Sequence, residues 1–118
     1  MWIFSRRGFY SVVEHKDNPN LILVRARREQ DLVNLVQKYE LPYQITEHPD
    51  YDYRWRLVID RLTWRELAFE LMVEIDYPSF KSKLAQTDQL DKLPMLLGFW
   101  EELVDYQKEH HLEKTERS

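Results

Sequence analysis

The stretch from Tyr51 to Asp60 alternates in polarity with the two-residue period of a β-strand. One side carries aromatic and aliphatic residues: Tyr53, Trp55, Leu57 and Ile59. The other side carries charged residues and one valine: Asp52, Arg54, Arg56, Val58 and Asp60. We therefore expect a strand with its apolar face on a core and its arginine face open to solvent, as antiparallel sheets allow.

Three further strands are expected around this one. Residues 2–14 read as a single β-prone strand in which Gly8 marks a bulge or bend. Residues 21–27 alternate cleanly and follow a turn-forming run of polar residues and proline. Residues 43–47 form a shorter strand before the turn that leads into the Tyr51–Asp60 strand. The four strands form two hairpins.

Helical periodicity separates and follows these hairpins. Residues 29–39 repeat apolar positions at the spacing of an amphipathic helix. A second helix is expected over residues 63–76, with Thr63 as its N-cap and Glu66 completing a capping box. A third is expected from about residue 90 to 109.

The order of elements is strand–strand–helix twice, followed by one helix. It predicts an α+β fold with a four-stranded antiparallel sheet and helices on one face. In sequence numbering the strand order is 1-2-4-3, a permuted ferredoxin-like arrangement. We expect one domain over residues 1–109 and a charged C-terminal tail over residues 110–118.

Composition narrows the classes of function. With no cysteine there is no disulfide framework, thiolate zinc site or cysteine nucleophile. No apolar run approaches a membrane span, and no signal peptide is visible, so we expect a cytoplasmic protein. Only two glycines occur, so a glycine-rich phosphate loop is missing, and the histidines show no metal-ligand spacing. We expect no cofactor and no metal.

Charge is distributed unevenly. The net charge of −4 argues against broad, non-specific binding of nucleic acid, although it does not exclude nucleic acid as a ligand. Residues 1–61 nevertheless hold ten Lys and Arg against nine Asp and Glu. Arginine dominates this half, and arginine binds phosphates and carboxylates through planar, bidentate contacts.

Arginines on the open sheet face are the first candidate site. Alternation predicts that Arg25, Arg27, Arg54 and Arg56 point outward, where they could bind an anionic ligand. Arg6 or Arg7 could join them, and Tyr10 could add a stacking surface. The alternative is an ordinary solvated face whose arginines pair with neighbouring acids, namely Glu14, Glu47, Asp52 and Asp60.

Self-association is an equal alternative for the same face. Leu21, Leu23 and Val58 share it with the arginines, and an open sheet of this kind can bury itself in a homodimer.

Several short motifs resemble an uncharacterised family of short bacterial proteins. They are M-W-I-F with G-F-Y-S-V-V at the start, L-V-R-A-R, D-Y-R-W-R and I-D-Y-P-S-F-K, and they fall within residues 1–84. Ser79 stands where the family pattern has asparagine. The resemblance implies no catalytic residue, because no activity is known for the family. It draws attention to four residues near the end of the second helix: Asp76, Tyr77, Phe80 and Lys81.

That segment is the second candidate site. A phenol at Tyr77 and an amine at Lys81 could build a small polar site at a helix end, although a helix stop packed on the core is the simpler interpretation. We therefore expect a non-enzymatic binding or regulatory module that works through its arginine-bearing sheet face. The alternative is a small enzyme of unknown reaction near Tyr77 and Lys81.

Overall fold

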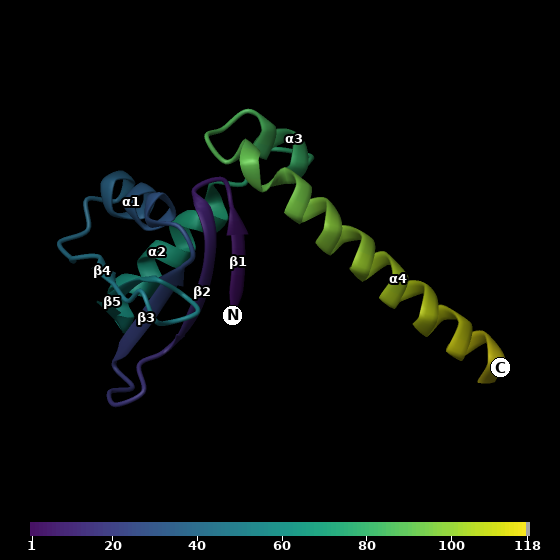
Figure 1. Ribbon diagram of the computed structural model, residues 1–118, viewed down its shortest axis with the longest axis horizontal. Coiled ribbons are helices and arrows are strands. Elements are labelled where there is room, and N and C mark those ends of the chain that lie inside the picture. The colour runs from purple at the N-terminus through teal and green to yellow at the C-terminus, as the bar shows by residue number, and fades with distance from the viewer. Residues whose placement is uncertain (118) are drawn as a thin grey trace. The chain divides into compact units, whose positions relative to one another are not determined.

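The computed structural model describes residues 1–117 and the side chains of residues 1–111. It divides the chain into two compact units, residues 1–78 (unit 1) and residues 79–118 (unit 2), and each is described by itself. Figure 1 shows the sheet and two helices of unit 1 and the helices of unit 2. The predicted α+β class is confirmed. The predicted boundary at residue 109 stays a prediction, because compactness does not show which parts fold independently.

Unit 1 contains one antiparallel sheet of five strands in the order β1-β2-β3-β5-β4. Their bounds are Trp2–Ser5 for β1, Gly8–Glu14 for β2, Leu21–Ala26 for β3, Thr46–Glu47 for β4 and Trp55–Asp60 for β5. The predicted four-stranded sheet in the order 1-2-4-3 is therefore wrong, and the ferredoxin-like arrangement has no support.

The extra strand arises at Arg6 and Arg7. These residues form a two-residue turn, so that Ser5 pairs with Gly8 and the segment predicted as one strand folds back on itself as β1 and β2. The Ser5 hydroxyl donates to the Gly8 carbonyl at 3.1 Å and accepts from the Arg7 backbone N–H at 3.2 Å. Gly8 is thus the first residue of β2, and the side chain of Ser5 stabilises the turn.

The strand predicted from residue 51 begins later. β5 starts at Trp55, and residues 48–54 form an irregular connection from β4. The alternation of β5 holds, because Leu57 and Ile59 are buried while Val58 between them is exposed. Tyr53, which alternation assigned to the core face, lies in the connection instead.

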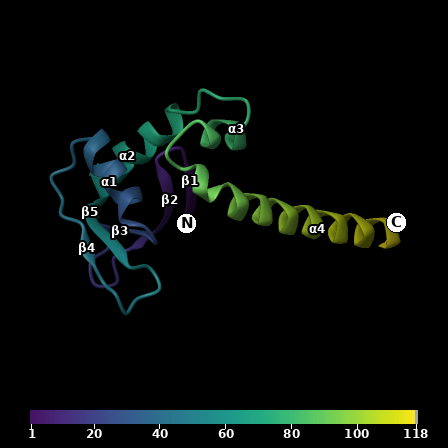
Figure 2. The same ribbon diagram turned by 45° about the horizontal axis from the view of Figure 1, so that its top comes forward.

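Helices α1 (Glu29–Lys38) and α2 (Arg61–Val73) cover one face of the sheet. Both lie beside β3 and β5 in the two views of Figures 1 and 2. The hydrophobic core lies between these layers. It is formed by Tyr10, Val12, Ile22, Val24, Ala26, Leu32, Leu35, Leu57, Ile59, Leu67 and Leu71.

Helix α2 begins three residues earlier than a Thr63 cap would give. Asp60 is the N-cap, and its carboxylate accepts from the Thr63 backbone N–H at 2.8 Å and from the Thr63 hydroxyl at 2.7 Å. The predicted Thr63 cap is therefore wrong. Aspartate is as good an N-cap as threonine, and here it is also the last residue of β5, so strand and helix join without a loop.

Unit 2 consists of α3 (Phe80–Ala85), a 3₁₀ turn η1 (Leu90–Lys92) and α4 (Leu93–Arg117). The Ser79 hydroxyl accepts from the Ser82 N–H at 3.4 Å and caps α3, a helix that the sequence did not predict. Helix α4 continues beyond the predicted end at residue 109, and Ser118 lies outside the described residues. None of the helices, over the described residues, has the length and apolarity to cross a membrane.

Candidate anion-binding site

The sheet face opposite α1 and α2 carries the predicted arginines. Strand register places Trp2 beside Ser11, Ser11 beside Arg25 and Arg25 beside Arg56. Residues that pair directly in antiparallel strands share a face, so these four side chains form one row across β1, β2, β3 and β5. Their neighbours along β3, Val24 and Ala26, point into the core on the other side.

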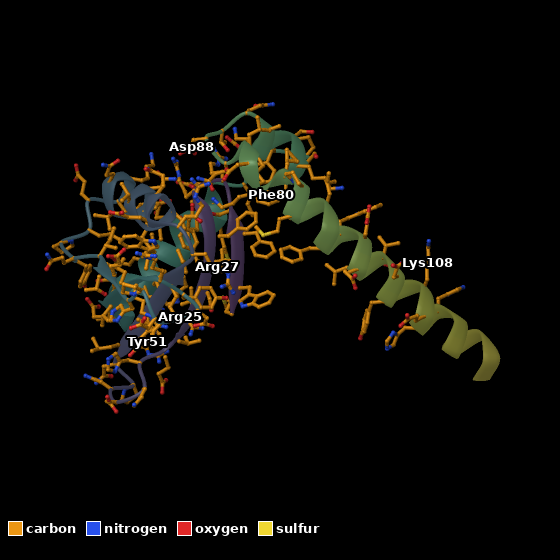
Figure 3. The ribbon with its side chains drawn as sticks, viewed as in Figure 1. Arg25, Arg27, Tyr51, Phe80, Asp88 and Lys108 are labelled. Atoms are coloured by element: carbon orange, nitrogen blue, oxygen red, sulfur yellow. The ribbon has the colours of Figure 1, made fainter. Side chains whose placement is uncertain are left out.

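Three arginines of this face surround two tyrosines. The guanidinium carbons of Arg25 and Arg27 lie 4.6 Å and 4.2 Å from the centre of the Tyr53 ring. The guanidinium carbon of Arg56 lies 4.4 Å from the centre of the Tyr51 ring. We call Arg25, Arg27, Arg56, Tyr51 and Tyr53 the arginine–tyrosine cluster. Figure 3 labels three of these residues in unit 1: Arg25 on β3, Arg27 just after it and Tyr51 in the connection before β5.

Hydrogen bonds hold the guanidinium groups in place. Arg25 donates to the Ser11 hydroxyl at 2.6 Å, Arg27 donates to the Asp52 carbonyl at 3.0 Å, and Arg56 donates to the Tyr53 carbonyl at 3.1 Å. The Nε of Arg25 is buried and has no acceptor in the described part of the chain. Arginine side chains that are stacked and hydrogen-bonded lose less conformational freedom when a ligand binds.

The cluster carries more positive than negative charge. Among the described residues, Asp52 is the one carboxylate within ion-pair distance of its guanidinium groups, at 3.9 Å from Arg56. The Asp52 side chain is 71% exposed, so water weakens its attraction for Arg56. Three guanidinium groups against one solvated carboxylate leave a local excess of positive charge.

Arg54 lies outside the cluster, although the sequence placed it there. Its Nε donates to the Glu47 carboxylate at 2.8 Å, and its guanidinium carbon lies 5.9 Å from the Trp55 ring. The predicted alternative of a neutralised face therefore holds for Arg54. Glu14 pairs with Arg61 of α2 at 2.6 Å, and Asp60 caps α2, so neither acid neutralises the cluster.

Tyr10 does not belong to this face. It is 3% exposed and lies in the core, where its hydroxyl donates to the Asp31 carbonyl at 2.7 Å. Burial, together with the charge of Asp31, raises the pKa of Tyr10 well above its usual value. The prediction that Tyr10 could stack on a ligand is wrong, because register pairs it with Ile3 on the helix-covered side.

Arg6 and Arg7 also lie away from the cluster, in the turn between β1 and β2. Arg7 makes a two-pronged ion pair with Glu74 at the end of α2, with N–O distances of 3.3 Å and 3.1 Å. Arg6 donates to the Glu74 carbonyl and to the Asp76 carboxylate. These contacts fasten the turn to the end of α2.

Tyr39 and Glu74 complete this network, which no sequence pattern predicted. The Tyr39 hydroxyl donates to the Glu74 carboxylate at 2.5 Å. Burial would raise the pKa of Glu74, but the hydrogen bonds from Arg7 and Tyr39 outweigh it and lower the pKa. Burial and the bond to Glu74 raise the pKa of Tyr39. These side chains bond to one another, although the buried Nε of Arg6 has no acceptor among the described residues, and we interpret the network as structural.

Tyr77 and Lys81 of the second predicted site each take part in a cation–π contact. The guanidinium carbon of Arg6 lies 5.7 Å from the centre of the Tyr77 ring, within unit 1. The ammonium group of Lys81 lies 4.4 Å from the centre of the Trp100 ring, within unit 2. Neither contact supplies an acid–base pair that could move a proton.

A groove of about 1010 Å³ along α2 is lined by residues of that helix, among them Leu62, Phe69 and Met72, and by Tyr39 and Leu41. It contains no residue of either predicted site. In the part of the chain whose side chains are placed, no three His, Asp or Glu residues come together in a way that could hold a metal ion.

Comparison of the chain with protein-family models, with curated proteins and with solved structures finds no significant match. The arrangement of side chains in unit 1 is therefore the basis for any statement about function.

Proposed function

We propose that this protein is a non-enzymatic binding module that recognises an anionic group at the arginine–tyrosine cluster. One observation carries the proposal: Arg25, Arg27 and Arg56 gather around Tyr51 and Tyr53, and among the described residues one exposed carboxylate lies beside them. Guanidinium groups bind phosphate and carboxylate through paired N–H donors, and their hydrogen bonds to charged acceptors are the stronger kind.

The stacking supports binding rather than mere solvation. A guanidinium that lies flat on a ring keeps its N–H edge available to an anion, while the ring fixes its orientation. Tyr51 is 55% exposed, so the edge of the cluster is open to solvent. Each guanidinium has five N–H donors, and Arg25, Arg27 and Arg56 use only part of theirs in the hydrogen bonds described above. The buried Nε of Arg25 is not among the donors that an anion could reach.

The test is isothermal titration calorimetry, in which the full chain is titrated with inorganic phosphate at low ionic strength. Replacing Arg27 or Arg56 by glutamine removes a charge-assisted hydrogen bond worth about 1.5–3 kcal/mol, so we expect roughly tenfold or greater loss of affinity. Arg65→Gln is the matched control, because Arg65 is exposed on α2, which covers the other face. Equal effects of all three substitutions, or no saturable binding by the wild type, would refute the proposal.

A further inference from the structure

Resting on the proposed function, we infer that the ligand class of the cluster is single-stranded nucleic acid. The inference comes from what stands beside the cluster on the same face. The row from β1 to β5 begins with Trp2, passes Ser11 and ends with Arg25 and Arg56. An aromatic ring and the arginines of the cluster thus lie in one line on this face, with the buried Ser11 between them.

Trp2 is placed to stack on a base. Its side chain is 69% exposed, although tryptophan is usually among the more buried residues of a small domain. It lies on an edge strand, so one side of the row is open. Strands are spaced about 4.8 Å apart, so the backbones at Trp2 and Arg56 are separated by roughly 14 Å across three spacings. A short run of nucleotides fits along such a row.

The two ends of the row suit the two parts of a nucleotide. Bases stack on aromatic side chains with little regard for sequence, while arginines in the same groove hold the phosphates. Tyr51, beside Arg56, is already stacked on His48 with 5.0 Å between the ring centres, so Trp2 is the ring of this row that a base would use. A small inorganic anion or an acidic peptide would use the arginines and leave Trp2 without a role.

A second copy of this chain fits the face less well. In a two-fold symmetric dimer the same patch occurs on both partners. The positive excess of one cluster would then be held close to that of the other, and juxtaposed like charges oppose association. A nucleic acid brings the opposite charge.

Duplex nucleic acid is a poorer candidate than a single strand. Its bases are already stacked and their faces are inaccessible to Trp2. The chain as a whole carries −4, which opposes the broad electrostatic contact that duplexes require. Binding should therefore depend on stacking together with a few phosphate contacts. If three guanidinium groups neutralise phosphates, log affinity should fall with log salt concentration with a slope of about −2.

The experiment titrates a fluorescein-labelled 12-nucleotide RNA without self-complementarity with the full chain. The fluorescence anisotropy of the RNA measures binding. We expect Trp2→Ala to weaken RNA binding by roughly fivefold to a hundredfold, as loss of one stacked base does, and Trp2→Phe to restore much of it. Trp100→Ala is the matched control, since Trp100 is 52% exposed on α4 in unit 2. Trp2→Ala should leave binding of inorganic phosphate unchanged.

Other outcomes separate this inference from the proposed function. Phosphate binding that depends on Arg27 and Arg56, together with no RNA binding or with no effect of Trp2→Ala on it, would overturn the inference and leave the anion site standing. Equal affinity for the RNA and for its duplex would overturn it as well. If Trp2→Ala instead lowers the mass of the free protein by light scattering and leaves RNA binding unchanged, the face is a self-association surface.

Discussion

Gly8 lies where β2 passes close to helix α1. A Cβ atom at this position would lie 2.6 Å from the Cβ of Asp31 and 2.7 Å from the hydroxyl of Tyr10. Both neighbours are buried and hydrogen-bonded, since Asp31 accepts from the Phe9 N–H at 3.2 Å and Tyr10 donates to the Asp31 carbonyl. Neither can move aside without losing a bond. There is therefore no room for a Cβ atom at position 8, and only glycine fits.

We expect Gly8→Ala to lower the free energy of unfolding by about 1–3 kcal/mol, the usual cost of inserting a methyl group into a packed site. The measurement is urea-induced unfolding followed by circular dichroism. The matched control is Gly98→Ala in α4, where a Cβ meets no atom within 4 Å. There alanine should stabilise the helix by about 0.5–1 kcal/mol. Similar shifts at the two positions would contradict this account.

Single residues also show how far the sequence could predict the site. Period-two alternation placed Arg25 and Arg56 on the open face, and the register confirms that they pair there. The apolar–polar alternation of residues 51–60 could not show that Tyr53 lies outside the strand. An irregular connection can continue the same alternation by coincidence. The partners of the arginines were therefore missed. The Tyr39–Glu74 contact joins residues 35 positions apart, which no local pattern reports.

Among the elements, the junction of β5 with α2 depends on one carboxylate. Asp60 accepts hydrogen bonds from Tyr43 and from the backbone and hydroxyl of Thr63, and these bonds lower the pKa of Asp60 to about 2. The reason is that the bonds, with that of Tyr43 contributing most, favour the charged carboxylate over the protonated form. The side chain of Asp60 thus joins the end of β5, the loop residue Tyr43 and the first turn of α2.

The lowered pKa predicts a direction for stability against pH. Since the folded-state pKa lies below the ordinary aspartate value of 3.8, the contribution of Asp60 is complete above that value and is lost as the pH falls towards 2. We expect the wild type to be more stable than Asp60→Asn at pH 5, with the difference shrinking at pH 2.5. Urea unfolding at both pH values measures it.

The control for this prediction is Asp17→Asn, because Asp17 is exposed in the connection between β2 and β3. The effect of this substitution on the free energy of unfolding should be small. If the difference between wild type and Asp60→Asn does not change with pH, the capping role assigned to the charged Asp60 is wrong.

The elements also show what sequence patterns could and could not predict. Amphipathic periodicity located α1 to within one residue of its observed end. The number of strands was missed because the Arg6–Arg7 turn lacks the Gly, Asn or Asp that usually marks a two-residue hairpin. Tertiary contacts explain the exception, since both arginines bind the end of α2. The start of α3 was missed because its six residues are too few to show a helical period.

At the scale of the whole molecule, the net charge and the local charge have opposite signs. The chain carries −4, yet the cluster on β3 and β5 has a local excess of positive charge. A ligand at a distance responds to the net charge, whereas a ligand in contact responds to the cluster. Because the net charge is negative, we predict that anions associate slowly and with little electrostatic steering. Because the local charge is positive, we predict that their affinity depends strongly on a few arginines.

The most direct test of the anion site is an NMR titration of the ¹⁵N-labelled full chain with inorganic phosphate, observing the arginine Nε–H resonances. We predict saturable shifts of Arg25, Arg27 and Arg56 with a common dissociation constant, while Arg54, which is paired with Glu47, and Arg65 on α2 shift little. Uniform, non-saturating shifts of all arginines, or shifts confined to residues outside the arginine–tyrosine cluster, would contradict the proposed function.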